Sequence, residues 1–216
     1  LRLSRNMKGI VMKALIFDVD GTLWDSRQAV AESWEELLFR ETGQHRGFTA
    51  ENISYLFGKP MNEISACLFP ELPPDRQLEM GQKCFLYENE YLASHPGELF
   101  PGVADTLKKL SLSYPLYIVS NCQSGYIEVF LQGTGLGALF KGHLCYGDTH
   151  TSKGQTIRRL MELHSLDDAL YIGDTQGDLN ACREAKIPFL FAAYGFGQVD
   201  EDIPSISCFS ELCSLL

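Results

Sequence analysis

The stretch LIFDVDGTL, residues 15–23, carries two aspartates two positions apart at the end of an apolar run. Such a run favours a buried strand, and Gly21 favours a turn directly after it. A single aspartate at this place could begin the turn or cap a helix. Two carboxylates on one face of a strand, Asp18 and Asp20, repel each other unless a cation or a proton lies between them. The stretch therefore predicts more than a turn at the end of this strand.

The composition is that of a soluble globular protein. The chain has 216 residues, which is enough for one large domain or for one domain with an insertion. Hydrophobic residues make up 45% and charged residues 21%. The net charge of −10 argues against a nucleic-acid partner bound through its phosphates. A small anionic substrate fits only if a metal or a few local cations reverse the field at the site.

The cysteines and the N-terminal residues bear on where in the cell the protein is expected to lie. Seven scattered cysteines, with no C-x-x-C pair, predict reduced and partly buried thiols in a cytoplasmic protein. No apolar run approaches the length of a membrane span, so we expect no membrane partner. The apolar part of residues 1–13 is too short for a signal peptide. Because the chain begins with Leu1, both Met7 and Met12 are candidate starts.

Apolar runs of strand type alternate with amphipathic helical stretches along most of the chain. This alternation predicts an α/β fold, in which helices cover both faces of a parallel sheet as in a Rossmann-like three-layer core. The predicted strands are 14–19, 115–121, 143–148, 169–174 and 188–195.

Residues 25–95 break the alternation, because they contain helical stretches and no strand signal. The helical stretches are 26–43, 49–58, 61–69 and 74–94, with glycines and prolines between them. We therefore predict an all-helical cap domain at 25–95, inserted after the first strand. The core would then consist of residues 1–24 and 96–216.

Polar side chains occur where several of the predicted strands end. In open α/β sheets, ligands bind outside the carboxyl ends of the strands. The residues expected to join Asp18 and Asp20 at this edge are Ser120, Asn121, Lys153, Asp174 and Asp178.

This set suits phosphoryl transfer. Asp18 and Asp174, with a backbone carbonyl, offer hard oxygen ligands that favour Mg²⁺ over zinc. Ser120, Lys153 and nearby backbone N–H groups can hold the oxygens of a phosphoryl group. A carboxylate that faces phosphorus can attack it and form an aspartyl phosphate. A second carboxylate two residues further on can protonate the leaving oxygen and later take a proton from water.

Four motifs carry a resemblance to a known family. DVDGTL, Ser120 in YIVSN, Lys153 in SKGQTI, and GDTQGD resemble, in this order, the four motifs of the haloacid-dehalogenase-like phosphatase superfamily. The helical insertion is similar to the cap of the phosphoglycolate phosphatase and β-phosphoglucomutase branch. Two positions depart from the common pattern. The third motif reads KGQT where many relatives have KPxP, and Trp24 stands where a smaller aliphatic residue is common.

The resemblance implies a role for each matching residue. Asp18 would be the nucleophile and Asp20 the general acid and base. The metal ligands would be Asp18, the Asp20 carbonyl and Asp174, with Asp178 in support. The phosphate ligands would be Ser120, Asn121 and Lys153.

Two further residues are candidates for substrate specificity. Trp24 could narrow the pocket or pack on the cap, and we expect packing. Lys59, in a predicted loop of the cap, could bind a second anionic group of the substrate or be a surface lysine beside a helix start. A Schiff-base role for Lys59, as in phosphonate-cleaving relatives, has no support from the residues around it.

The resemblance implies a Mg²⁺-dependent phosphatase that acts on a small phosphorylated metabolite, such as phosphoglycolate, through a phosphoaspartate. Such a protein would be a monomer or a homodimer. The aspartate at position 20, which true dehalogenases lack, favours phosphate chemistry. The same machinery could instead run a sugar-phosphate mutase similar to β-phosphoglucomutase. A non-catalytic phosphate-binding protein similar to a response-regulator receiver is a third possibility, although the order Asp, Ser, Lys, Asp and the cap argue against it.

Overall fold

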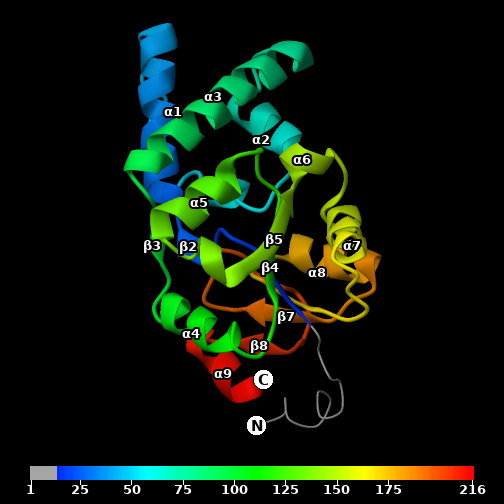
Figure 1. Cartoon of the computed structure of the whole chain (residues 1–216). Helices are drawn as coiled ribbons and strands as arrows, with labels where there is room; N and C mark the ends of the chain where they lie inside the picture. Colours follow the sequence, from blue (N-terminus) through cyan, green and yellow to red (C-terminus); the bar gives the residue numbers. More distant parts are fainter. Residues whose placement is uncertain (1–13) are drawn as a thin grey trace.

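The computed structural model describes residues 14–216, so the candidate starts Met7 and Met12 and the expectation of no signal peptide lie outside the described residues. Within this range, six strands form one parallel sheet in the order β5-β4-β1-β6-β7-β8 (Figure 1). The predicted α/β fold with a parallel sheet is therefore confirmed. The strands are β1 (Leu15–Phe17), β4 (Leu116–Ser120), β5 (Phe140–Cys145), β6 (Leu170–Gly173), β7 (Phe189–Ala192) and β8 (Ser205–Ile206).

Helices cover both faces of this sheet. They are α4 (Val103–Leu110), α5 (Tyr126–Thr134), α7 (Lys153–Leu163), α8 (Gln176–Ala185) and α9 (Leu212–Leu215). Successive side chains of a strand point to opposite faces. Leu15 and Phe17 of β1 accordingly belong to a core cluster that includes Phe130 of α5. Ile16, between them, belongs to a second cluster that includes Ile157 of α7. β1 is thus buried on both faces, which positions the residues that follow it.

Three helices lie between β1 and α4 in the chain and form the upper part of the molecule in Figure 1. They are α1 (Arg27–Thr42), α2 (Met61–Leu68) and α3 (Pro74–Ser94). α3 packs against α1 and α2, and it also packs against α5 of the core. Where α3 meets α2, a Cβ added at Gly81 would lie only 1.9 Å from Ser65 Oγ. We call α1–α3 and their connections the helical segment; its status as a separate cap domain at 25–95 stays a prediction.

One predicted helix of this segment is wrong. Residues 49–58 contain only the short 3₁₀ turn Ser54–Leu56. Asn52 Oδ1 accepts a hydrogen bond from the Thr49 backbone N–H, and Thr49 Oγ1 accepts one from the Asn52 backbone N–H. Local bonds of this kind compete with the helical pattern. Gly58, with a φ of 82°, then ends the stretch in a conformation that no α-helix contains.

The chain passes from the core into the helical segment and later returns, and the two connecting stretches form a short antiparallel strand pair. β2 (Trp24–Asp25) pairs with β3 (Glu98–Leu99), with Trp24 opposite Leu99. This pair was not predicted from the sequence, since two residues are too few to show the alternation of a strand. The pair brings the chain that leaves the core beside the chain that returns to it.

The predicted strand at 143–148 is displaced toward the N-terminus. β5 covers Phe140–Cys145, and the short helix α6 (Tyr146–Thr149) follows at once. Asp148 Oδ2 accepts a hydrogen bond from the Cys145 backbone N–H over 2.9 Å, which caps this helix and ends the strand. β8, also two residues long, was not predicted.

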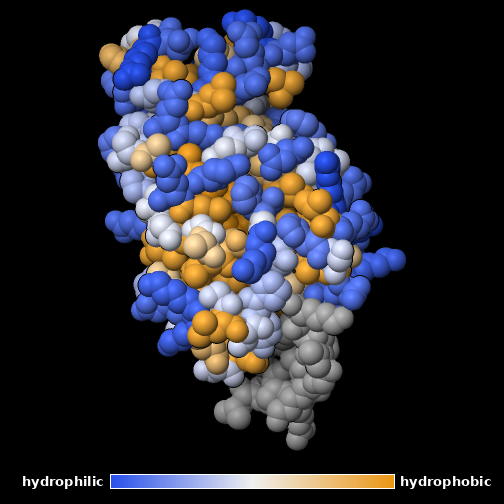
Figure 2. All heavy atoms as spheres, in the orientation of Figure 1, coloured by the Kyte–Doolittle hydropathy of each residue, from blue (hydrophilic) through white to orange (hydrophobic). Residues whose placement is uncertain are grey.

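The surface in the view of Figure 2 is mostly polar over the helical segment, with smaller apolar patches among the polar residues. Exposed large apolar side chains of this segment include Phe39, Leu78 and Leu86. No helix in residues 14–216 is both long and apolar enough to span a bilayer. All seven cysteines are free, and four of them are buried.

Candidate active site

Asp18 lies just after β1 and is held by Lys153. The Asp18 backbone N–H donates to the carbonyl of Ile172 on the neighbouring strand β6, over 2.9 Å. Lys153 Nζ donates to Asp18 Oδ1 over 2.9 Å and to Asp178 Oδ1 over 2.5 Å. Burial raises the pKa of Asp18 to about 6, against the opposing effect of Lys153. The structure thus brings three of the predicted site residues into direct contact.

Lys153 is the first residue of α7 and is buried. The N-terminal end of a helix is the less favourable end for a cation. Burial alone would also lower the pKa of Lys153, but the carboxylates of Asp178 and Asp18 raise it above its ordinary value. Lys153 is therefore held as a cation between two carboxylates.

Asp174, directly after β6, completes an acidic group. One carboxylate oxygen each of Asp18, Asp174 and Asp178 lie within 4.8 Å of one another. Asp174 Oδ2 accepts from the backbone N–H groups of Phe196, over 2.8 Å, and Gly197, over 3.2 Å. Asp174 Oδ1 is buried and has no hydrogen-bond partner among the described residues. Burial and the neighbouring carboxylates of Asp178 and Asp18 raise the pKa of Asp174 well above its ordinary value.

These observations fit a bound divalent cation. An unpartnered carboxylate oxygen, buried beside two further carboxylates, is costly unless a positive charge meets it. A donor set made only of oxygens suits Mg²⁺. A Cβ at Gly21 would lie 2.1 Å from Asp174 Oδ2, so the glycine of DVDG lets this turn approach the acidic group.

Asp178 has partners on both of its oxygens. Oδ2 accepts from the Thr175 backbone N–H over 3.0 Å and from Thr175 Oγ1 over 2.8 Å. Thr175 Oγ1 accepts in return from the Asp178 backbone N–H, which makes a capping box at the start of α8. The other oxygen, Oδ1, bonds to Lys153. The start of α8 therefore fixes the position of Lys153, and a supporting role of Asp178 at a metal stays a prediction.

Asp20 has different partners from Asp18. Asp20 Oδ1 accepts from Trp24 Nε1 over 2.9 Å, from Ser26 Oγ over 2.6 Å and from the Tyr126 hydroxyl over 2.7 Å. Burial raises the pKa of Asp20, although the three hydrogen bonds lower it. The expectation that both aspartates lie on one face of a strand is wrong, since β1 ends at Phe17. The two carboxylates instead face separate sets of side chains.

Two of the three predicted phosphate-binding residues, Ser120 and Asn121, lie at the end of β4. Ser120 is the last residue of this strand and is buried. Phe17 lies opposite Ile118 in the register of β1 and β4, so Ser120 reaches the same sheet edge as Asp18. Asn121 Nδ2 donates to the carbonyl of Gly58, just before α2, over 3.0 Å. Their contact with phosphate stays a prediction.

Neither candidate for substrate specificity lines the pocket beside Asp20. Trp24 is fully buried, and its ring lies edge-on to Tyr126 and Phe130. Trp24 therefore packs, but these ring contacts are with α5 of the core rather than with the cap as expected, and its indole N–H bonds to Asp20. Lys59 is partly exposed, and Gly58 rather than Lys59 lies in the pocket wall.

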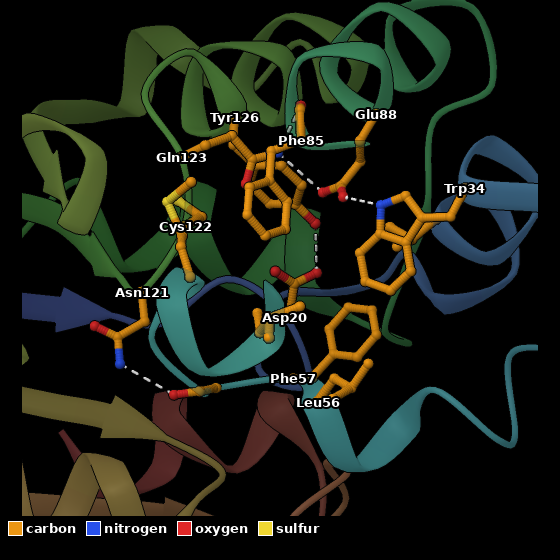
Figure 3. Close-up of a pocket in the computed structure, with 14 residues that line it drawn as sticks. Asp20, Trp34, Leu56, Phe57, Phe85, Glu88, Asn121, Cys122, Gln123 and Tyr126 are labelled. Carbon is orange, nitrogen blue, oxygen red and sulfur yellow. Dashed lines mark hydrogen bonds between the residues drawn. The ribbon is translucent and has the colours of Figure 1, made fainter. Parts of the chain in front are cut away.

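The pocket lies between the helical segment and the core, with a cavity volume of about 40 Å³. Figure 3 shows Asp20 and Glu88 pointing into it from opposite sides. The core also contributes Asn121, Cys122, Gln123 and Tyr126. The helical segment contributes mainly apolar side chains, among them Val30, Trp34, Leu56, Phe57, Met61 and Phe85.

Glu88, on α3, is a pocket residue that the sequence analysis missed. Its Oε2 accepts from Trp34 Nε1 over 2.8 Å, and its Oε1 accepts from Gln123 Nε2 over 3.0 Å. Burial raises the pKa of Glu88 to about 8. A signal was present in the sequence, because a glutamate stands on the face of α3 where apolar residues recur at helical spacing. The buried residues of α3 are Gly81, Cys84, Phe85, Glu88 and Leu92.

Comparison with known proteins gives one family for nearly the whole chain. Residues 15–192 match the family described as haloacid dehalogenase-like hydrolase. The chain is 26% identical over 200 residues to the phosphoglycolate phosphatase of Aquifex aeolicus, which covers 91% of this chain and 92% of that protein. It is 29% identical over 197 residues to the phosphoglycolate phosphatase of Synechococcus elongatus, which covers 86% of this chain and 85% of that protein.

Solved structures give the same result for the fold. A haloacid dehalogenase-like hydrolase from Streptococcus pneumoniae matches with a TM-score of 0.78 and 26% identity, over 95% of this chain and 99% of that one. A putative haloacid dehalogenase-like hydrolase from Bacteroides fragilis matches with a TM-score of 0.80 and 22% identity, over 93% of this chain and 99% of that one.

Proposed function

The chain belongs to the haloacid dehalogenase-like hydrolases, and we propose that it is a Mg²⁺-dependent phosphatase that hydrolyses a small organic phosphate monoester through a phosphoaspartate at Asp18. The observation that carries this proposal is the buried contact of Lys153 with Asp18 and Asp178, next to the unpartnered oxygen of Asp174. It brings the proposed nucleophile, a fixed cation and the proposed site of a second cation together at one sheet edge. Phosphoryl transfer depends mainly on such positioning and charge neutralisation.

The metal site in this proposal uses the acidic group. Asp18, the backbone carbonyl of Asp20 and Asp174 would hold Mg²⁺, with Asp178 in support, and the bound ion would supply positive charge that neutralises the phosphoryl oxygens. Lys153 supplies a further positive charge whose position is fixed by Asp178. Ser120 and Asn121 would bind the remaining oxygens of the phosphoryl group.

The first chemical step assigns one role to each aspartate of DVDG. An oxygen of Asp18 attacks phosphorus, and the bond from phosphorus to the ester oxygen breaks. Asp20 gives its proton to that leaving oxygen, so that the alcohol departs neutral. The pKa of Asp20 is raised by burial, which supports a protonated acid at the start of the reaction.

The second step returns the enzyme to its starting state. Asp20, now ionised, takes a proton from a water molecule as the water oxygen attacks phosphorus. The bond between Asp18 and phosphorus breaks, and inorganic phosphate is released. The donors Trp24, Ser26 and Tyr126 hold Asp20 in one orientation for both proton transfers.

Residues 25–95 act in this proposal as a cap that excludes bulk water from the site. Several contacts between the helical segment and the core support such a closed arrangement. Phe57 lies edge-on to Phe196, with ring centroids 5.6 Å apart, and Asn89 Nδ2 donates to the Ser124 carbonyl over 3.0 Å. The small cavity that remains favours a small substrate. The free cysteines agree with a cytoplasmic location.

Phosphate release from a panel of phosphate esters tests the proposal. The panel includes 2-phosphoglycolate, because several relatives are named phosphoglycolate phosphatases, and hexose phosphates. We expect release from at least one ester with Mg²⁺ and none after chelation. Asp18→Asn should lower kcat by roughly 10³-fold or more. The exposed control Asp105→Asn on α4 should leave it unchanged.

Three results would count against the proposal in different ways. Wild-type rates in Asp18→Asn would remove the nucleophile from it. Release that does not depend on a divalent cation would remove the metal. An isomerised sugar phosphate without free phosphate would indicate a mutase instead.

A further inference from the structure

The wall of the pocket opposite Asp20 combines aromatic rings with a single carboxylate and no cation. Trp34, Phe57 and Phe85 line it together with Glu88. Among the described residues, no lysine, arginine or histidine side chain lines this pocket. The leaving group of a phosphate ester at Asp18 would enter this space, since Asp20, the proposed acid for the leaving oxygen, forms part of its wall. The charged side chains of this wall therefore determine which charge on the leaving group is favoured.

Glu88 is fixed in the pocket by two donors from different parts of the fold. Trp34 Nε1, from α1, bonds to one oxygen over 2.8 Å, and Gln123 Nε2, from the loop before α5, bonds to the other over 3.0 Å. The side chain is 5% exposed, so water does not replace these partners. Each oxygen keeps a lone pair that can accept a further hydrogen bond. Figure 3 shows the carboxylate between Trp34 and the loop of Gln123, facing the cavity.

A buried carboxylate of this kind needs either a proton or a cationic partner. Burial raises the pKa of Glu88 to about 8, so the empty pocket keeps the proton. A cation that enters can take the place of that proton. A carboxylate in a pocket that aromatic side chains also line is a setting that can bind ammonium groups, through charge and through cation–π attraction.

We propose that Glu88 is a specificity-determining residue, and that the preferred substrate is the phosphate monoester of a small amino alcohol, whose ammonium group binds Glu88 in the pocket that Trp34 and Phe85 also line. This inference rests on the phosphatase proposed above. A carboxylate in the leaving group, as in 2-phosphoglycolate, would be buried in this pocket with no cationic side chain to balance it, whereas an ammonium group can replace the proton of Glu88, so the carboxylate is disfavoured.

The size of the cavity limits the leaving group further. Its volume of about 40 Å³ gives room for roughly three water-sized groups. That is the size of two methylene groups and one ammonium group beyond the ester oxygen.

Three esters of similar length and different charge test this inference. Phosphoethanolamine ends in an ammonium group, ethyl phosphate in a methyl group, and 2-phosphoglycolate in a carboxylate. We expect kcat/KM for phosphoethanolamine to exceed that for ethyl phosphate by about tenfold or more, mainly through KM. The value for 2-phosphoglycolate should be the lowest of the three.

Variants of Glu88 assign the preference to this side chain. Glu88→Gln should reduce the ratio between phosphoethanolamine and ethyl phosphate to near one. Glu88→Asp, which keeps the charge but withdraws it by one methylene, should give an intermediate ratio. The control Glu90→Gln, exposed on the same helix, should keep the wild-type ratio. Thermal unfolding of each variant checks that it folds. Where a variant does not fold, the ratio of kcat/KM between phosphoethanolamine and ethyl phosphate in the wild-type protein still tests the inference.

The outcomes separate this inference from the proposed function. Turnover that depends on Asp18 but is as fast with ethyl phosphate or 2-phosphoglycolate would overturn the inference and leave the phosphatase intact. A preference that survives Glu88→Gln would also overturn it. If the protein hydrolyses none of the esters, the proposed function fails. Binding of the same three esters, measured by calorimetry, then tests the inference about Glu88 by itself. Tighter binding of phosphoethanolamine would support the inference, and equal or absent binding would overturn it.

Discussion

Asp18 and Asp20 have different chemical surroundings although only Val19 separates them. Asp18 contacts the ammonium of Lys153, whereas Asp20 accepts hydrogen bonds from two hydroxyls and an indole. A carboxylate beside a fixed cation stays ionised and can attack, and a buried carboxylate without one more readily holds a proton. Different environments for two neighbouring carboxyls are a general way to divide the roles of nucleophile and acid.

Glu88 makes the stability of the protein depend on pH. The pKa of Glu88 is raised by burial to about 8 in the folded state, from an ordinary value of 4.5. Between these two values the folded chain holds a proton that the unfolded chain releases. The contribution of Glu88 to the free energy of unfolding is therefore fully present below pH 4.5 and is lost as the pH rises toward 8.

Chemical denaturation at pH 5 and pH 8 measures this effect. Between these two values, the wild-type protein should lose a few kcal/mol more of its free energy of unfolding than Glu88→Gln does, at about 1.4 kcal/mol for each unit of pKa shift. Because the other carboxyl groups titrate in both proteins, the difference between the two reports Glu88. Parallel pH profiles for the two proteins would show that Glu88 does not keep its proton in the fold.

The start of α8 links an ordinary feature of a helix to the site. Thr175 and Asp178 form a capping box there, and Asp178 also holds Lys153. Thr175→Ala should lower the free energy of unfolding by about 1–2 kcal/mol, because the N-cap hydroxyl is lost. Thr175→Ser keeps the hydroxyl and should restore most of that loss. Urea denaturation of the three proteins makes the comparison, and equal stability of Thr175→Ala and the wild type would contradict this role.

Some elements of the fold could be predicted from the sequence and others could not, for physical reasons. β1, β4 and β6 are buried on both faces, so their continuous apolar runs were visible in the sequence. The pair β2–β3 was missed because each strand has only two residues, and residues 49–58 were predicted as a helix although Thr49 and Asn52 bond locally. Short elements and side-chain bonds to the local backbone leave little periodic signal.

The candidate site also has a part that could be predicted from the sequence and a part that could not. Residues directly after strands of a parallel sheet must meet at one edge, so Asp18 and Asp174 could be predicted to lie together. The wall that holds Glu88 depends instead on how α3 packs against α1 and α5. Contacts between residues as distant in sequence as Glu88 and Trp34 are set by the tertiary fold, and no local pattern encodes them.

The arrangement of the whole molecule gives each part of the proposed reaction to a different part of the chain. The sheet edge brings together Asp18 and Lys153, Trp24 and Ser26 with Tyr126 of α5 supply the donors to Asp20, and the helical segment supplies the far wall of the pocket (Figures 1 and 3). Because of this division, residues in the wall of the helical segment can be changed without altering the residues at the sheet edge.

The most direct test of this account is to trap the covalent intermediate. The protein is mixed with Mg²⁺ and the best ester of the panel, quenched with acid during the first turnover, and digested for mass spectrometry. We expect one phosphoryl group on the peptide that contains Asp18, and none in Asp18→Asn treated in the same way. A phosphoryl group on another residue, or rapid phosphate release with no phosphorylated peptide, would contradict the central role of Asp18.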